Sequence, residues 1–441
     1  MRRKINLVIL SFALLSSVNA QGYLPNATYT GDTGNRIGHS NSTPSDCTGG
    51  KMNSPSEIIQ VGSNVLIAGM AGTDLGDFFI HKKNANTGAN IQMLFVHVND
   101  FLNLPLGSGA SFIKGMKYDP VLDRIYVYGS TSLSGYSGFI LCYNQTTMIP
   151  DNSFDFDGLQ MLYSGDIMAD LVVLNDSRIV TLINTSNSFK IVEISTTGNW
   201  IANLLVNDAS KSFSARRIKT YPSKPNRFYV VGKILSNSIN TPGIWGIDRI
   251  PNKFYPTQFQ LIATNNQISS TEGVGEFEDL CFPMNNSTGI CDIVVVGNSS
   301  VGTVNTGWTS QSSGIYIKYK GSLSTTPFNL IIENSFKNQS SLPGVGIATN
   351  IPSPNKAYFT RCAVVGSMIL VIGSDGVDDN ATVGLINSTG TNYSRMYIAP
   401  YSGANRVHFP RGFYLNSGGQ VFLSGCDTEF GLTSIKLDPV Q

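Results

Sequence analysis

A short run of β-branched and aromatic residues recurs seven times along the chain, and six of the seven copies end in glycine. The runs occupy residues 65–69, 125–129, 179–183, 228–232, 293–297, 369–373 and 421–425. Continuous apolar runs of this length, bounded by turn residues, are typical of strands that are buried on both faces. A strand that recurs in this way indicates an architecture assembled from one repeating unit.

A second, weaker strand follows each run after a polar loop, and a further strand precedes it, such as residues 112–118 before the second copy. The second strands are predicted at residues 77–82, 138–143, 189–194, 243–248, 314–319, 382–386 and 432–437. Seven units of three or four short strands, without helical periodicity, predict an all-β fold, a seven-bladed β-propeller. A β-sandwich would not require the sevenfold period.

The ends of the chain bear on how the ring closes. The last repeat runs to Gln441 and leaves no room for a fourth strand, whereas residues 24–29 (LPNATY) are similar to residues 149–154 (IPDNSF) of the second repeat. We therefore predict that residues of about 23–34 complete the last blade, which would close the ring and cover its edges.

The N-terminus predicts secretion. Arg2, Arg3 and Lys4 precede an apolar run over residues 5–15, and small residues follow at 18–20, which is the pattern of a signal peptide. We predict a signal peptide at 1–20 and a single propeller domain at 21–441. No stretch approaches the roughly 20 apolar residues of a transmembrane helix. The expected location is extracellular, or periplasmic or at the cell surface if the source is bacterial.

One repeat carries a more specific pattern. Residues 125–129 (IYVYG) are followed by 140–144 (ILCYN), then by 150–154 (PDNSF) and the pair Asp157-Gly158. This unit resembles the delta-sixty repeat of bacterial secreted and surface proteins, and the other copies match it only in the two strand patterns. The resemblance implies a propeller-like fold and says little about activity.

The six cysteines predict up to three disulfides in an oxidising compartment, with the connectivity open. Cys281 and Cys291 flank a turn-rich stretch between two apolar runs, so we predict a disulfide across that hairpin. The chain also holds Asn-x-Ser/Thr triplets that would be glycosylated only in a host with the machinery, so a glycoprotein is one interpretation and chance the other. The triplets begin at Asn26, Asn41, Asn144, Asn175, Asn184, Asn285, Asn286, Asn298, Asn338, Asn380, Asn387 and Asn392.

Charge is scarce: 30 Lys and Arg against 29 Asp and Glu give a net charge of +1, and only 13% of the residues are charged. This balance argues against nucleic-acid binding. One charge nevertheless falls at nearly the same place in the strand that opens each repeat. The seven are Glu57, Lys114, Asp170, Arg217, Asp279, Arg361 and Arg411.

If the opening strands are innermost, these seven charges form one layer around the channel, with signs that nearly alternate. Alternation would let each charge pair with its neighbours and would fix the register of the blades. The exception is the adjacent pair Arg361 and Arg411, which would leave a site for an anion such as a carboxylate or sulfate.

Other candidate residues lie in loops and at strand ends. Asp375, Asp378 and Asp379 could gather around calcium but lack EF-hand spacing, and no other cofactor is indicated. Tyr136 and Trp308 could stack on a sugar or a protein partner, or pack on their own blades. Glu276 and Glu278 should share one face of their strand, with Asp279 on the other.

Nucleophile elbows, P-loops, dinucleotide fingerprints and zinc-type histidine pairs are absent from the sequence. The interpretation is a secreted binding or surface-interaction module without catalysis, whose ligand is an extracellular glycan, a small anion or a protein. The alternative is an extracellular carbohydrate-active enzyme at the channel mouth, with Asp170, Asp279 or Glu57 as acid and base.

Overall fold

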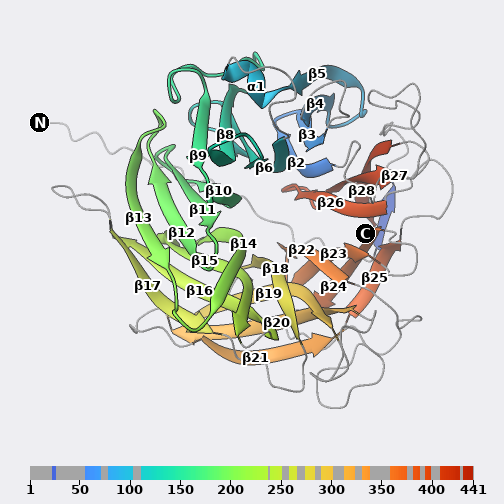
Figure 1. Cartoon of the computed structure of the whole chain (residues 1–441). Helices are drawn as coiled ribbons and strands as arrows, with labels where there is room; N and C mark the ends of the chain where they lie inside the picture. The colour runs from blue at the N-terminus through green and yellow to red at the C-terminus, as the bar shows by residue number, and fades with distance from the viewer. Residues whose placement is uncertain are drawn as a thin grey trace, which may run out of the picture.

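The computed structural model describes residues 22–25, 55–70, 78–102, 111–236, 239–250, 258–265, 274–283, 290–300, 312–322, 330–337, 358–374, 381–387, 393–398, 408–427 and 431–440. These residues form seven four-stranded antiparallel sheets arranged around a central axis (Figure 1). The predicted seven-bladed β-propeller is therefore confirmed. The blades are numbered 1 to 7 in chain order.

Each of the first three blades is built from four strands that are consecutive in the sequence. Blade 1 consists of β2 (Pro55–Val61), β3 (Asn64–Met70), β4 (Phe78–Asn84) and β5 (Asn90–Val96), followed by the one-turn helix α1 (Val98–Phe101). Blade 2 consists of β6 (Ser111–Asp119), β7 (Arg124–Thr131), β8 (Tyr136–Asn144) and β9 (Leu159–Tyr163). Blade 3 consists of β10 (Ile167–Val173), β11 (Ile179–Asn184), β12 (Phe189–Ile194) and β13 (Trp200–Val206).

The next three blades repeat this order. Blade 4 consists of β14 (Ser212–Tyr221), β15 (Lys224–Ser236), β16 (Ile239–Ile250) and β17 (Gln258–Asn265). Blade 5 consists of β18 (Val274–Cys281), β19 (Ile290–Ser300), β20 (Ser312–Ser322) and β21 (Leu330–Lys337). Blade 6 consists of β22 (Tyr358–Val365), β23 (Met368–Ser374), β24 (Ala381–Asn387) and β25 (Tyr393–Ile398).

Both ends of the chain build blade 7, in which β26 (His408–Leu415), β27 (Val421–Asp427) and β28 (Gly431–Val440) are joined by β1 (Gly22–Pro25). Strand β1 pairs antiparallel with β28, from Gly22 opposite Val440 to Pro25 opposite Leu437. The predicted closure by an N-terminal strand is confirmed for residues 22–25. The rest of the predicted segment and the signal peptide at 1–20 lie outside the described residues.

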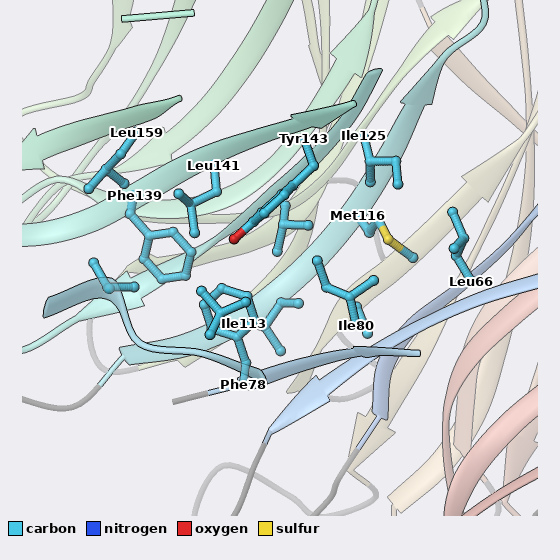
Figure 2. Packing of buried hydrophobic residues seen from close by; sticks show 14 of the residues in the cluster. Leu66, Phe78, Ile80, Ile113, Met116, Ile125, Phe139, Leu141, Tyr143 and Leu159 are labelled. Carbon is cyan, nitrogen blue, oxygen red and sulfur yellow. The ribbon is translucent and has the colours of Figure 1, made fainter. Parts of the chain in front are cut away.

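The seven apolar runs of the sequence are the second strands of the blades, β3, β7, β11, β15, β19, β23 and β27. They are buried on both faces because each sheet packs against the sheets on either side. Figure 2 shows this packing between blades 1 and 2, where Phe78 of β4 stacks on Phe139 of β8 with ring centroids 5.7 Å apart. Burying one such side chain stabilises the fold by about 1.5–3 kcal/mol.

The glycine that ends most of these runs has a steric cause. A Cβ atom added at Gly129, Gly232 or Gly297 would lie 2.0 to 2.2 Å from a backbone carbonyl oxygen of the first strand in the same blade. Real Cβ atoms do not approach backbone this closely, so these positions accept no side chain. The recurrent glycine thus marks a close approach between the first and second strands.

The structure does not place the predicted pair Cys281 and Cys291 opposite each other. Cys281, the last residue of β18, lies opposite Val294 of β19, while Cys291 lies opposite Gly321 of β20. Because Cys291 is three residues beyond the point where β18 stops, the two cysteines are not cross-strand neighbours. The Cys281 thiol is free and buried.

Within the described part of the chain, no helix is long and apolar enough to cross a membrane.

Candidate functional site

The first strand of each blade lies nearest the central axis (Figure 1) and contains a β-bulge. In blades 1 to 6 the register shift skips one residue of the first strand. These bulge residues are Ser56, Lys114, Ala169, Arg216, Glu278 and Thr360. A bulge interrupts the alternation of a strand and redirects a side chain, and here it does so at the same place in each blade.

The residue after each bulge lies opposite the next-to-last residue of the apolar run in the second strand. We call these seven positions the charge layer. They are Glu57, Gly115, Asp170, Arg217, Asp279, Arg361 and Gly412.

The predicted single layer of seven charges is wrong for Lys114, which is a bulge residue in blade 2, while Gly115 takes the layer position. A Cβ atom at Gly115 would lie 2.2 Å from the Tyr128 hydroxyl oxygen, so the tyrosine fills this place. Arg411 likewise precedes the glycine of its blade, Gly412. The side chain of Arg411 lies outside the described residues.

Arg217 connects three blades in the charge layer. Its Nη1 atom is 3.5 Å from Asp170 Oδ1 in the neighbouring blade and 3.6 Å from Glu57 Oε2 in blade 1. Asp170 also accepts hydrogen bonds from the Tyr128 hydroxyl at 2.6 Å and from the Ile218 backbone N–H at 3.1 Å. The expectation that charges pair with neighbours around the ring is incomplete, since Arg217 also reaches across the channel.

Asp279 makes a second set of contacts between blades. Lys219 Nζ lies 2.8 Å from its Oδ1 atom, and the backbone N–H of Cys362 donates to its Oδ2 atom at 3.0 Å. Asp279 therefore holds blades 4, 5 and 6 together. Like Asp170, it accepts the N–H of the residue that follows a layer arginine in the next blade.

Burial raises the pKa of both aspartates, but their cationic partners outweigh it. Lys117 and Arg217 hold the pKa of Asp170 below its ordinary value, and Lys219 and Arg217 do the same for Asp279. Both carboxylates are thus ionised and at most 2% exposed. None of Asp170, Asp279 and Glu57 lines the cavity described below, which disfavours predicted roles as acid and base in it.

The six bulge residues all line one cavity of about 840 Å³, the central cavity. Arg217 and Arg361 of the charge layer also reach it, so its ionisable lining in the described residues is Lys114, Arg216, Arg217, Arg361 and Glu278. Neutral polar groups complete much of the wall. They include Asn184, Thr185, Ser186, Ser212, Ser214 and Asn298.

Arg361 lies in this wall beside a second cation, Arg217. Burial lowers its pKa, and the like charge of Arg217 lowers it further, so that Glu57 and Asp279 do not restore the ordinary value. A negative charge in the central cavity would stabilise both guanidinium groups.

Glu278 and Glu276 form a carboxyl pair beside Arg216, which contacts both oxygens of Glu276 at 2.9 Å. Burial raises the pKa of Glu278 to about 7, against the pull of Arg216 and with a further rise from Glu276. The pKa of Glu276 is lowered, because Arg216 outweighs burial. Glu278 is therefore the member of the pair that titrates near neutral pH. The bulge at Glu278 interrupts the alternation on which the predicted common face of Glu276 and Glu278 relied.

The remaining candidates lie elsewhere. Tyr136 is half-buried and stacks on Tyr163 of its own blade, with ring centroids 6.3 Å apart, and it does not line the central cavity. Trp308 and the predicted calcium ligands Asp375, Asp378 and Asp379 lie outside the described residues. Among the described residues no cluster of His, Cys, Asp and Glu suits a metal ion.

Sequence reasoning missed Lys117, Lys219 and Tyr128, which partner the buried aspartates, and Arg216, which lines the cavity. Two adjacent residues of like charge could have indicated the bulge. They are Arg216 with Arg217 and Glu278 with Asp279. In each pair the bulge places the first residue in the cavity wall and the second in the charge layer.

No family model and no curated protein matches this chain. Solved structures of similar fold include an ulvan lyase of polysaccharide lyase family PL25 bound to -[GlcA(1-4)Rha3S]-, with a TM-score of 0.51, 8% identity and coverage of 87% of this chain and 94% of that one. Sqt1 of Chaetomium thermophilum, bound to the N-terminus of ribosomal protein L10, has a TM-score of 0.48, 12% identity and coverage of 88% and 84%. The β-propeller domain of the Trilobed protease of Pyrococcus furiosus has a TM-score of 0.43, 9% identity and coverage of 87% and 96%. At these identities the likeness concerns the fold alone.

Proposed function

We propose that the protein binds an anionic carbohydrate in the central cavity, as a secreted recognition module. The observation that carries the proposal is the lining of that cavity, which combines four cationic side chains with one carboxyl group whose pKa is raised to about 7. Arginine suits carboxylate and sulfate groups because its planar guanidinium donates two parallel hydrogen bonds.

The three arginines of the cavity wall differ in role: Arg217 pairs with acidic residues of other blades, while Arg216 and Arg361 are the candidates to contact a ligand. Arg217 is held by Glu57 and Asp170 and is at most one-tenth exposed, so it supports the floor of the cavity. Arg216 is two-fifths exposed, although Glu276 contacts it. Arg361, whose pKa is lowered by burial and by Arg217, gains most from a bound anion.

The neutral part of the wall favours a sugar over an inorganic anion. Hydroxyl and amide groups from blades 1, 3, 4, 5 and 6 face the cavity, and the buried side-chain oxygen of Asn298 has no hydrogen-bond partner in the described part of the chain. A sugar hydroxyl would donate to that oxygen. The volume of about 840 Å³ falls within the range of roughly 300–1,000 Å³ typical of small-molecule sites.

Calorimetry on the mature chain tests this proposal. We expect tri-galacturonate or a sulfated chondroitin disaccharide to bind, and neutral maltotriose to bind at least tenfold more weakly. Arg361→Gln should reduce the affinity for the acidic sugars at least tenfold. Lys224→Gln is the matched control, because it removes one positive charge at the β14–β15 turn and lies away from the central cavity.

Equal affinity for neutral and acidic sugars would overturn the proposal, as would equal losses in the two variants. Tight binding of free sulfate alone would show a small-anion site instead. Capture of a protein segment, without any sugar binding, would show a protein-recognition module.

A second candidate function is cleavage of an acidic polysaccharide, and the pKa of Glu278 favours it. A carboxyl group with a pKa near 7 that lines a cavity suits a general acid or base. One solved structure of similar fold holds -[GlcA(1-4)Rha3S]-, which makes uronic-acid polymers the first substrates to test. If the wild-type protein releases new chain ends from the polysaccharide and Glu278→Gln binds it without releasing them, the protein is an enzyme. If the wild-type protein binds the polysaccharide and releases no chain ends, it is a recognition module.

Secretion belongs to the same proposal, and so does the hypothesis of a bacterial delta-sixty-repeat protein. Expression of residues 1–441 in a secreting host should give a medium or periplasmic product that begins at Gln21. A product retained in the cytoplasm with Met1 intact would contradict it.

A further inference from the structure

Two cysteines from different blades meet in the core between blades 5 and 6. Cys281 ends β18 and Cys362 lies in the middle of β22, and they are 6% and 2% exposed. Both belong to one buried cluster, together with Val294 and Val296 of blade 5 and Phe359 of blade 6. Cys281 lies close enough to raise the pKa of the Cys362 thiol further, in addition to the effect of burial.

The backbone fixes this meeting. Asp279 Oδ2 accepts the backbone N–H of Cys362 at 3.0 Å, so Cys362 is held against β18. Asp279 and Cys281 are two residues apart on one strand, and the pairing from Asp279 to Cys281 is regular. Their side chains therefore lie on the same face, the one directed to blade 6.

We propose that Cys281 and Cys362 form a disulfide that links blade 5 to blade 6 in the secreted protein. The two side chains share one buried cluster, and Cys362 is held against β18, which is the placement that a disulfide between the two blades requires. Cys142 is buried in the cluster between blades 2 and 3, and that cluster contains no second cysteine among the described residues.

The chemistry is thiol–disulfide exchange with an oxidised thiol oxidoreductase or a small-molecule disulfide, which the oxidising compartment supplies. The thiolate of one cysteine attacks the disulfide of the oxidant and forms a mixed disulfide. The thiolate of the other cysteine then displaces the oxidant's remaining thiolate. The two cysteines lose two protons and two electrons in total, and the oxidant leaves with both of its sulfurs reduced.

Oxidation belongs to folding and precedes the closure of the ring. In the folded protein both thiols are buried, and burial raises the pKa of the Cys362 thiol well above its usual range. The thiolate needed for attack is therefore rare once the blades have packed. The same burial protects the finished disulfide from soluble reductants.

The bond would join two innermost strands that are distant in sequence, since 362 − 281 = 81 residues separate the cysteines. Cross-links that close long loops restrict the unfolded chain most strongly. We expect the melting temperature to be several degrees higher with the disulfide than without it.

Peptide mapping tests the proposal on the chain purified from a secreting host. The protein is unfolded in guanidinium with iodoacetamide and without reductant, digested, and analysed by mass spectrometry. We expect one peptide that joins Cys281 to Cys362 and carries no alkylation on either cysteine. Full alkylation of both residues, or a link from either to another cysteine such as Cys291, would overturn the proposal.

Variants provide a second readout. Cys281→Ala and Cys362→Ala should each release one alkylatable thiol at the other position and lower the melting temperature to a similar extent. Reductant present during refolding should lower the melting temperature of the wild type and leave that of the double variant unchanged. Cys142→Ala should retain the cross-linked peptide, and its loss in that control would also count against the assignment.

Discussion

The Arg217 guanidinium lies 3.6 Å from the Glu57 carboxylate, although the two residues come from blades 4 and 1 on different sides of the ring. Arg217 contacts Asp170 as well, so one cation neutralises charges from two other blades. Removing one partner of a buried ion pair typically costs about 3–5 kcal/mol, because the remaining charge stays desolvated. This relationship leads to the first prediction.

Arg217→Met should lower the free energy of unfolding by about 3–5 kcal/mol, because Glu57 and Asp170 lose their shared cation. Arg216→Met is the control at the adjacent residue, whose guanidinium is two-fifths exposed. That change should cost less than about 1 kcal/mol. Urea denaturation followed by circular dichroism measures both, and similar losses would show that the bulge does not separate the two positions.

Gly129→Ala should destabilise blade 2 severely, because its Cβ atom would lie 2.0 Å from the Phe112 carbonyl oxygen. Overpacking of this kind costs about 1–3 kcal/mol or more. Gly418→Ala is the control, because its Cβ would meet Asn416 Oδ1 at 3.4 Å. Thermal melts compare the two variants, and a Gly129→Ala protein with the wild-type melting temperature would exclude the steric cause of the recurrent glycine.

Anion binding should weaken as the pH rises through about 7. The folded pKa of Glu278 is raised from 4.5 to about 7, so the carboxyl is neutral below that pH and negative above it. The arginines stay charged throughout, so ionisation of Glu278 lowers the net charge of the cavity lining by one unit. Calorimetry with tri-galacturonate from pH 5.5 to 8.5 measures the slope.

Glu278→Gln supplies the control for this titration, since an amide does not ionise. The affinity of that variant should stay constant across the range, whereas an unchanged slope would assign the titration to another group. The free energy of unfolding should also fall as the pH rises. Between pH 4.5 and about 7, Glu278 keeps its proton in the folded state and loses it in the unfolded chain. The contribution of Glu278 to stability is therefore full below pH 4.5 and decreases toward pH 7.

Deletion of residues 21–36 should sharply lower the melting temperature of the mature protein. Strand β1 is the outer strand of blade 7 and pairs with β28 over residues 22–25, so its loss exposes a sheet edge and opens the ring. Differential scanning calorimetry checks this. An unchanged transition would mean that the pairing of β1 with β28 contributes nothing to closure.

The propeller could be predicted from the sequence because its strands are buried on both faces and repeat. Each apolar run carries its own local signal, and the similarity of residues 24–29 to 149–154 indicated the closing strand. The cavity could not be predicted in the same way. A bulge shifts the register by one residue, which alternation alone does not reveal.

The phenylalanines before the layer positions show the effect of the bulge on the register. Phe277 and Phe359 lie two positions before a layer charge and are buried opposite strand-end glycines. Phe112 lies two positions before Lys114 but is 42% exposed, because Ile113 occupies the buried place. Contacts across the channel, such as Arg217 to Glu57, depend on how wide the ring is, and no local pattern encodes that.

The bulges also separate the part of the protein that holds the ring together from the part that faces a ligand. Ser56, Lys114, Ala169, Arg216, Glu278 and Thr360 stand at equivalent sites and differ in size and charge. Since the ladder register skips these positions, substitution there would alter the cavity without changing a register pair. Proteins with the same charge layer could thus bind different ligands. Substitutions at the six bulge positions would change the cavity lining and leave the contacts of the charge layer in place.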